Sequence, residues 1–386
     1  MVTYSTGSYF TAVGKYALFT IETASNYTAV GYNALTAATG AENTALGASA
    51  LGTNTTGANN TAVGVNALLV NTTGSSNTAV GEFALDANTT GGKHVAIGYL
   101  ALSANTTANS NTAVGYQASY SNTTGNTNTA IGYESLYTNT QGDRNTAVGH
   151  QALYTMNHSG NADSYNTGVG FYALYANTIG YRNTAVGGLS LDALVTGNNN
   201  TAIGYAAATS RTSGNDNVAV GAYCMNAVAT ANHNTAVGKS AMHDLTTGSE
   251  NVAMGVNALF ACTTGYNNVA LGYRALDAAT TVHSCIAIGY DALGGSNTSN
   301  SQVAIGRGAM GANTSGEGVA VGAYAMAANT TGSQNTAVGY QALDTNTTGS
   351  HNTAVGNESL DANTTASYNT ALGSTALQLN TTGGNN

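Results

Sequence analysis

Residues 60–76 read N-T-A-V-G-V-N-A-L-L-V-N-T-T-G-S-S, and residues 77–93 repeat the pattern as N-T-A-V-G-E-F-A-L-D-A-N-T-T-G-G-K. The same unit of about seventeen residues recurs along the chain, in twenty-two copies aligned on the Gly at their fifth position. Self-similarity at a short fixed period is typical of solenoids and fibres. The consensus is N-T-A-V-G-Y-x-A-L-x-x-N-T-T-G-x-x, and we number its positions as columns one to seventeen.

The length of the unit indicates which class of repeat it forms. Seventeen residues are too few for the helical hairpin of an ankyrin or tetratricopeptide repeat, and the leucine-rich signature is absent. Charged residues make up 6% of the 386 residues, so the helix formers Glu, Lys and Arg are scarce. We therefore predict an all-β fold, a parallel β-solenoid of about 22 coils with one repeat per coil. It is expected to form one continuous domain over residues 1–386, with a partial unit at 1–9 and an inserted loop at 156–165.

Three columns predict which way the strand of each coil faces. Column two is Thr or a β-branched aliphatic residue and column four is aliphatic or Met, so we expect both to point into the core. Column three would then point outward, although it is Ala in every unit except at Gly168. We interpret this narrow stripe as a candidate subunit interface, with turn geometry as the alternative reason for its small size. Its members include Ala62, Ala79, Ala113, Ala130, Ala147 and Ala185.

Other columns predict contacts between coils. Column one is mostly Asn, and stacking at about 4.8 Å would join these amides in a hydrogen-bonded ladder. Column five is always Gly, which indicates a corner with positive φ or close backbone approach. Column six is often Tyr, which predicts a stacking stripe; glycan binding is the alternative, because aromatic faces suit sugar rings.

The N-T-T triplet of columns twelve to fourteen has the form of an N-glycosylation acceptor. A tight turn is the first interpretation, because Asn and Thr suit corners, and a row of sugars is the second. The Thr rows also suggest ice binding. Two features argue against it: the N-T-T rows are broken at Leu194 and Cys262, and column two is expected to point inward. The candidate acceptors are Asn54, Asn71, Asn88, Asn105, Asn122, Asn313, Asn329, Asn346, Asn363 and Asn380.

The sequence offers little for catalysis or cofactor binding. The seven His residues and the carboxylates gather in no column with metal-ligand spacing, and no P-loop or G-x-S-x-G motif occurs. Cys224, Cys262 and Cys285 do not stack in adjacent coils, which predicts no disulfide. We therefore predict no enzyme activity, cofactor or metal. A net charge of −9 argues against nucleic acid, and no apolar run is long enough to span a membrane.

The runs N-T-A-V-G at 111–115, Q-V-A-I-G at 302–306 and H-V-A-I-G at 94–98 resemble the head motif of YadA-type trimeric autotransporter adhesins, a left-handed parallel β-roll. The full unit resembles repeat tracts of phage and algal-virus fibre proteins and of bacterial surface proteins. The resemblance implies a trimeric or otherwise laterally associated fibre. We therefore expect a non-enzymatic, rod-like shaft, homotrimeric in the first interpretation, that is extracellular, on a cell surface or on a virion. The alternative is a head-to-tail filament, with or without N-glycans, because the repeat continues unchanged toward both ends. A glycan-binding or ice-binding solenoid is the lower alternative.

Overall fold

Each repeat closes one coil and contributes one short strand to a parallel sheet. The computed structural model describes residues 3–4, 8–21, 25–158, 163–227 and 229–386. Strands β7 (Thr61–Val63) and β8 (Thr78–Val80) pair in parallel with Ala62 opposite Ala79, and the same register recurs from coil to coil. The predicted all-β parallel solenoid with a repeat of about seventeen residues is therefore confirmed, and the described residues contain no helix.

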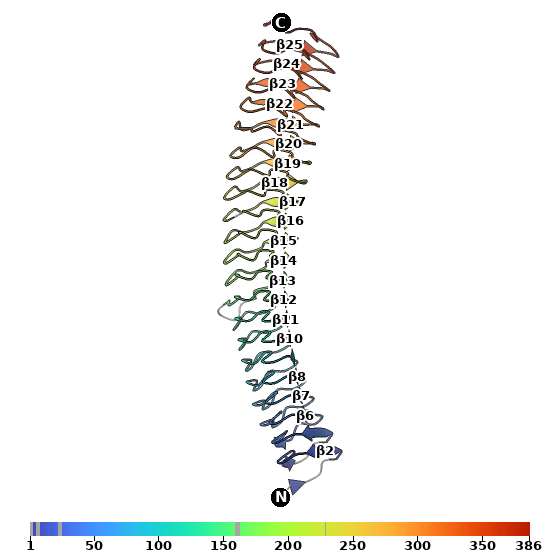
Figure 1. Ribbon diagram of the computed structural model, residues 1–386, viewed down its shortest axis with the longest axis vertical. Coiled ribbons are helices and arrows are strands. Elements are labelled where there is room, and N and C mark those ends of the chain that lie inside the picture. The colour runs from blue at the N-terminus through green and yellow to red at the C-terminus, as the bar shows by residue number, and fades with distance from the viewer. Residues whose placement is uncertain (1–2, 5–7, 22–24, 159–162, 228) are drawn as a thin grey trace. The chain divides into compact units, whose positions relative to one another are not determined.

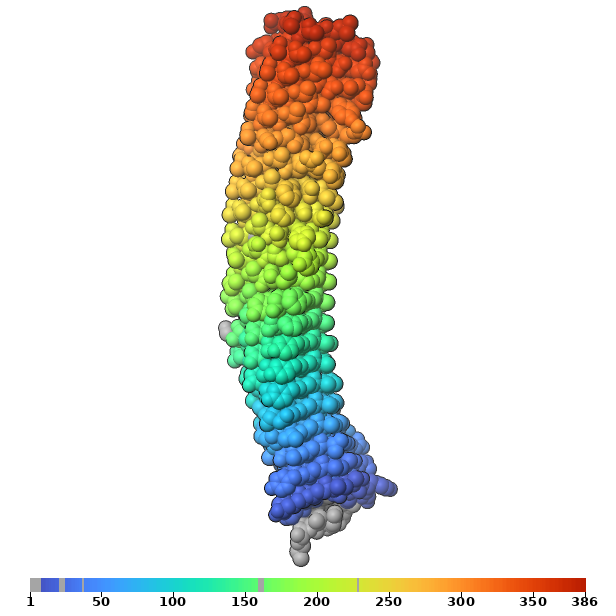
Figure 2. Space-filling view, viewed as in Figure 1, coloured from blue at the N-terminus to red at the C-terminus, as the bar shows by residue number. Residues whose placement is uncertain are grey.

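The chain divides into two compact units, Met1–Asn198 and Asn199–Asn386, and each is built from the same type of coil (Figure 1). Within each unit, successive coils pack directly on one another (Figure 2). The coil strands of the first unit are β2 (Phe10–Val13), β4 (Tyr27–Val30), β6 (Thr44–Leu46), β7, β8, β9 (Val95–Ile97), β10 (Thr112–Val114), β11 (Thr129–Ile131), β12 (Thr146–Val148), β13 (Thr167–Val169) and β14 (Thr184–Val186). A small parallel sheet of β1 (Thr3–Tyr4), β3 (Thr20–Ile21) and β5 (Ala37–Ala38) lies beside them.

The second unit contains eleven coil strands, paired in the same register. They are β15 (Thr201–Ile203), β16 (Val218–Val220), β17 (Thr235–Val237), β18 (Val252–Met254), β19 (Val269–Leu271), β20 (Ile286–Ile288), β21 (Val303–Ile305), β22 (Gly318–Val321), β23 (Asn335–Val338), β24 (Thr353–Val355) and β25 (Thr370–Leu372).

The predicted side-chain directions within each strand are wrong. The column-three Ala side chains lie inside the coil, whereas columns two and four are partly exposed on the outer face of the sheet. Gly168 shows why column three is small: a Cβ built there would lie 3.4 Å from Leu153 Cγ and 3.1 Å from the Ala173 carbonyl oxygen. The predicted interface residues therefore have no surface to offer a second chain. Ala62, Ala79, Ala113, Ala130, Ala147 and Ala185 are all 0% exposed.

The corner Gly of column five has both expected properties, a positive φ and a close approach to the neighbouring backbone. Gly64 has a φ of 134°, and a Cβ built on it would lie 2.5 Å from the Gly81 carbonyl oxygen of the next coil. Any side chain would force the two coils apart. Direct backbone contact therefore sets the spacing between neighbouring coils at this corner.

The remainder of each coil turns through left-handed backbone that coil-to-coil hydrogen bonds hold in place. Asn66, Leu68 and Ser76, in columns seven, nine and seventeen, have φ values of 58°, 52° and 62°. Such a conformation costs roughly 1–2 kcal/mol for a residue like Leu. The Leu68 amide donates to the Ala84 carbonyl at 3.0 Å, and this bond recurs between most of the other coils. The ladder therefore offsets a strain that an isolated coil would not tolerate.

The expected inserted loop at 156–165 falls partly outside the described residues, which omit 159–162. On either side of it, β12 and β13 keep their register, with Thr146 opposite Thr167. Met156 is fully buried in column twelve of its coil. The longer repeat therefore leaves strand pairing between these two coils unchanged.

Candidate functional site

Two internal Asn ladders hold the coils together. In column one, the backbone N–H of Asn77 donates to Asn60 Oδ1 at 3.0 Å, and Asn60 Nδ2 donates to the Gly74 carbonyl at 2.9 Å. This ladder confirms the expectation for column one. Column twelve forms a second, unpredicted ladder, in which Asn71 Nδ2 donates to Asn54 Oδ1 at 2.8 Å and to Gly74 at 2.9 Å.

The second ladder corrects the expectation of N-glycosylation, because it is built from the candidate acceptors. Nine of the ten side chains are at most 1% exposed. Their Nδ2 atoms, which would carry the sugar, are enclosed and donate hydrogen bonds within the coil. The turn interpretation is therefore correct, and Asn380 alone among the ten is partly exposed. The buried nine are Asn54, Asn71, Asn88, Asn105, Asn122, Asn313, Asn329, Asn346 and Asn363.

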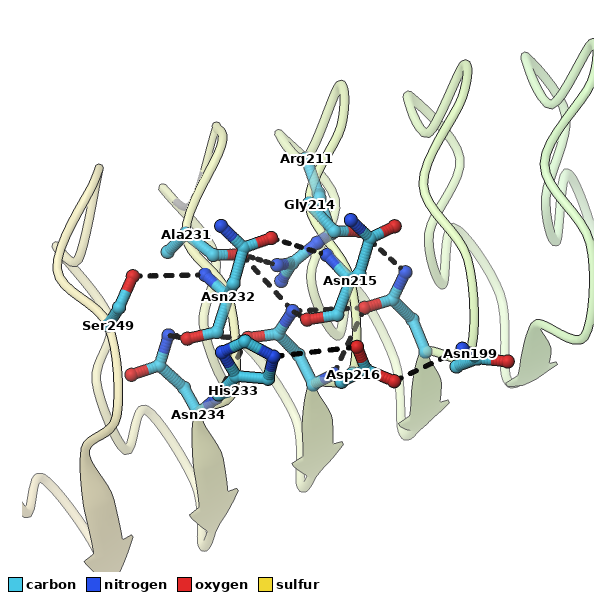
Figure 3. A network of polar contacts seen from close by, with 12 residues as sticks. Asn199, Arg211, Gly214, Asn215, Asp216, Ala231, Asn232, His233, Asn234 and Ser249 are labelled. Carbon is cyan, nitrogen blue, oxygen red and sulfur yellow. Dashed lines mark hydrogen bonds and ion pairs between the residues drawn. The ribbon is translucent and has the colours of Figure 1, made fainter.

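Arg211 interrupts the column-twelve ladder in the second unit (Figure 3). Its side chain is fully buried and donates from one terminal nitrogen to the Ala231 carbonyl oxygen. Its Nε and other terminal nitrogen have no hydrogen-bond partner in the part of the chain that is described. Burial lowers the pKa of the guanidinium to about 10. Among the described residues, no carboxylate forms an ion pair with this buried cation, which is therefore a weak point of the stack.

Beside Arg211, the outer edge of the turns carries a polar row (Figure 3). The Asn215 amide N–H donates to Asn232 Oδ1 at 2.8 Å, and the Asn232 amide N–H donates to Ser249 Oγ at 3.3 Å. Asp216 accepts from Asn199 at 3.1 Å and lies 3.6 Å from His233 Nε2. Column sixteen thus links these coils through side chains, and the row is structural.

The outer sheet face, which we define as columns two and four of the coils, repeats aliphatic side chains beside Thr residues. It bears no charged residue. Leu46 is 46% exposed and Met254 47%, and most of the other column-four side chains are half-buried. The column-two Thr hydroxyls make no hydrogen bond to described residues, whereas the column-thirteen hydroxyl of Thr72 donates to the Thr89 carbonyl at 3.0 Å. The outer sheet face therefore combines methyl groups with hydroxyls that are free for an external partner.

Aromatic side chains stack in two ladders in the first unit, as expected for column six. Neighbouring rings lie 5.0–5.5 Å apart in column six and 5.2–5.3 Å apart in column ten, and nearly all of these pairs are close to parallel. The ring faces are turned toward each other, so a sugar ring cannot stack on an inner ring. Burial raises the pKa of Tyr137 and of Tyr154, and neighbouring phenols and Glu134 add to the shift. The ladders are Tyr99, Tyr116, Tyr133, His150 and Phe171, and Tyr120, Tyr137, Tyr154 and Tyr175.

A hollow of about 530 Å³ opens in the second unit where glycines replace larger residues. It is lined by Tyr290, Asp291, Arg307, Gly308 and Tyr324. A second hollow shares Asp291, Gly308 and Tyr324 and extends past Gly294 and Gly311. Sequence reasoning missed this site, although the breaks in the repeat at positions 294, 308 and 311 were its visible signal.

The described residues contain no cluster of His, Cys, Asp and Glu that could hold a metal ion. The three cysteines are buried and unpaired, and burial raises the pKa of the Cys224 thiol to about 12 and that of Cys262 to about 11. Reaction with small reagents is therefore disfavoured at neutral pH. His94, in column one, bonds to the Ala108 carbonyl at 2.7 Å and so takes the place of an Asn.

No helix in the described part of the chain is long and apolar enough to cross a membrane. In comparisons with known proteins, no family model and no curated protein matches the chain. The surfaces described above are therefore what a functional argument has to rest on.

Proposed function

We propose that the chain is a non-enzymatic structural protein that associates laterally with its own copies through the outer sheet face. In this role it would form the shaft of an extracellular, cell-surface or virion fibre that spaces or displays other components. The observation that carries the proposal is the uncharged outer sheet face, which repeats in every coil and leaves aliphatic side chains such as Leu46 and Met254 nearly half exposed. Extended apolar surfaces of this kind mark sites of association.

The area of the outer sheet face in one unit is close to that of a specific protein contact. A three-residue strand of about 10 Å and a strand spacing of about 4.8 Å give roughly 48 Å² per coil. The eleven strands of one unit then offer roughly 500 Å², or about 1,000 Å² counting both partners. Specific interfaces bury about 1,200–2,000 Å² in total. The face of one unit by itself is therefore close to the lower end of this range.

The mass in solution tests this proposal, measured by light scattering behind a sizing column at several concentrations. A constant threefold mass would support the trimeric shaft. A broad, concentration-dependent series would support the head-to-tail filament instead, and a monomer at all concentrations would contradict self-association.

Charged substitutions then test the surface itself. Val269→Lys with Val303→Lys places two charges on the outer sheet face and should reduce the mass to that of the monomer. Asn267→Lys with Ser301→Lys is the matched control, because these exposed residues lie outside that face. Equal masses for both variants would contradict association through columns two and four.

Ice binding is a second candidate, favoured by the direction of column two. Eight of the nine strands from β6 to β14 present an outward Thr, and Val95 is the exception. Neighbouring Thr residues are spaced by about 4.8 Å, and columns two and four by about 6.6 Å along each strand. The regular row of outward hydroxyls is the feature that favours this candidate. Thermal hysteresis that is lost in Thr129→Lys would support this function, and normal ice growth with the native chain would exclude it.

A further inference from the structure

The hollow in the second unit is a gap in two outward columns of side chains. Arg274, Asp291, Gly308 and Tyr324 follow one another in column seven, so the coil of β21 has no side chain at that position. Column ten is also empty in two successive coils, at Gly294 and Gly311. The coils on either side supply the walls, and the resulting space of about 530 Å³ has the size of a small-ligand site.

Aromatic rings bound the hollow on two sides. Tyr290 stacks on Tyr273 with a centroid distance of 5.3 Å. Its other face has no ring partner among the described residues, because column six of the next coil is Arg307. Tyr324 leans over Gly308, where a Cβ would lie 3.0 Å from the ring. Tyr290 therefore has a ring stacked on one face only, unlike the inner rings of the ladders in the first unit.

The two arginines near the hollow, Arg274 and Arg307, differ in whether a carboxylate compensates their charge. Arg274 Nε lies 2.7 Å from Asp277 Oδ2 and 3.6 Å from Asp291 Oδ1, so its charge is compensated. Arg307 has no carboxylate within ion-pair distance in the described chain; its guanidinium lies 4.9 Å above the centre of the Tyr324 ring and contacts the phenol oxygen. The Asp291 carboxylate accepts no hydrogen bond from described residues. The site thus has a cation without a carboxylate partner, Arg307, beside a carboxylate, Asp291, that faces Arg274 and accepts no hydrogen bond from the described residues.

We propose that this hollow binds an acidic sugar, a pyranose that carries one carboxylate. Its carboxylate pairs with Arg307 through the two-pronged geometry that guanidinium groups favour. The C–H face of the ring packs on Tyr290, and its hydroxyls donate to Asp291. A phosphate group fits less well, because its second negative charge would lie near the Asp291 carboxylate. The hollow uses columns six, seven and ten, so binding is independent of the outer sheet face.

Ligand-observed saturation-transfer NMR on the full chain tests this site, with glucuronic acid as the probe and glucose, acetate and adenosine monophosphate as comparisons. We expect binding of glucuronic acid, and at least tenfold weaker binding of the other three. Arg307→Gln and Tyr290→Ala should each weaken glucuronic acid binding at least tenfold. Lys239→Gln and Tyr340→Ala are matched controls, since both residues occupy column six of coils outside the hollow, and they should leave binding unchanged.

Three results would overturn the proposal. The first is the absence of saturation transfer to glucuronic acid. The second is equal binding of glucose, acetate or the nucleotide, which would show that the carboxylate and the sugar ring are not recognised together. The third is an equal loss of binding in the control variants. Gly308→Gln fills the gap with a residue that column seven accepts elsewhere, at Gln117 and Gln341, and should abolish binding while the circular dichroism spectrum stays native.

Discussion

Replacing Arg211 by Asn should stabilise the second unit. The guanidinium is enclosed in a column of uncharged side chains, and two of its nitrogens lack hydrogen-bond partners among the described residues. Asn is the consensus residue of column twelve, and at position 71 its Nδ2 donates to the carbonyl of Gly74, three residues later. In Arg211→Asn, the equivalent acceptor is the carbonyl of Gly214. The substitution therefore removes a buried charge and restores one hydrogen bond of the ladder.

The magnitude follows from the pKa of Arg211, which burial lowers from the ordinary arginine value to about 10. Each unit of pKa corresponds to about 1.4 kcal/mol, so burial of the charge costs roughly 3 kcal/mol. The restored hydrogen bond adds about 1 kcal/mol, and the packing lost with the longer side chain removes roughly 1–2 kcal/mol. We expect a net gain of about 2 kcal/mol in the free energy of unfolding.

Urea unfolding followed by circular dichroism measures this gain, together with hydrogen exchange of the amides around Arg211, because coil stacks can open locally. Arg211→Leu should also stabilise, since it removes the charge without restoring the amide, whereas Arg211→Lys should not. Arg182→Asn is the control at an exposed arginine. Lower stability of both the Asn and Leu variants would refute the reasoning, because the contacts of the guanidinium would then outweigh the cost of burying it.

The pH dependence offers an independent check of the same charge. The folded-state pKa of Arg211 lies below its unfolded value, so the unfolded chain binds more protons between about pH 10 and 12.5. The destabilisation by Arg211 is complete below about pH 10 and disappears as the pH rises through this window. The difference in stability between Arg211→Asn and the native chain should therefore be largest at neutral pH and should shrink as the pH rises above about 10.

Other substitutions test the remaining parts of the coil. Gly64→Ala should destabilise the first unit by more than about 3 kcal/mol in urea unfolding, because its Cβ would lie 2.5 Å from the Gly81 carbonyl oxygen at a φ of 134°. Ala130→Leu should lower the free energy of unfolding by roughly 1–3 kcal/mol, because it overpacks the core. Thr129→Val on the outer sheet face should change it by less than about 0.5 kcal/mol. Similar costs for the two variants would contradict the inward direction of column three and the outward direction of column two. In chains secreted from eukaryotic cells, glycopeptide mass spectrometry should find the nine buried acceptors unoccupied, so that among the ten candidates sugar is expected only at Asn380; an occupied buried site would contradict the second ladder.

The repeat fixed much of the fold in advance, but it left open which face of the strand points inward. Period, composition and the Gly of column five predicted parallel coils with a backbone contact at the corner, and column one predicted an Asn ladder. Strict alternation over three residues defines two faces without saying which is buried. The better signal was the near-constant Ala of column three: only an enclosed position such as Ala62 demands one small size in almost every coil, while the outward Thr61 and Val63 are free to vary.

The functional surfaces were harder to predict, because each depends on which columns point inward and which point outward. The N-T-T triplets matched an acceptor pattern, but the Gly three residues after Asn71 marks the turn that encloses its amide. Column nine adopts left-handed backbone at Leu68, which the intrinsic preferences of Leu would not predict. The glycines at 294, 308 and 311 stood out as departures from the repeat, yet they mark a hollow only once columns seven and ten are known to point outward.

The corner contact between Gly64 and Gly81 has a consequence for how such a chain can change its length. Because the same backbone groups meet at nearly every junction, one coil presents to its neighbour the same corner backbone that nearly any other coil would present. Removal or duplication of one whole repeat in frame therefore joins surfaces that already fit, and no compensating substitution is required. Genetic recombination between repeats could thus lengthen or shorten the protein in steps of one coil while every remaining junction keeps its geometry.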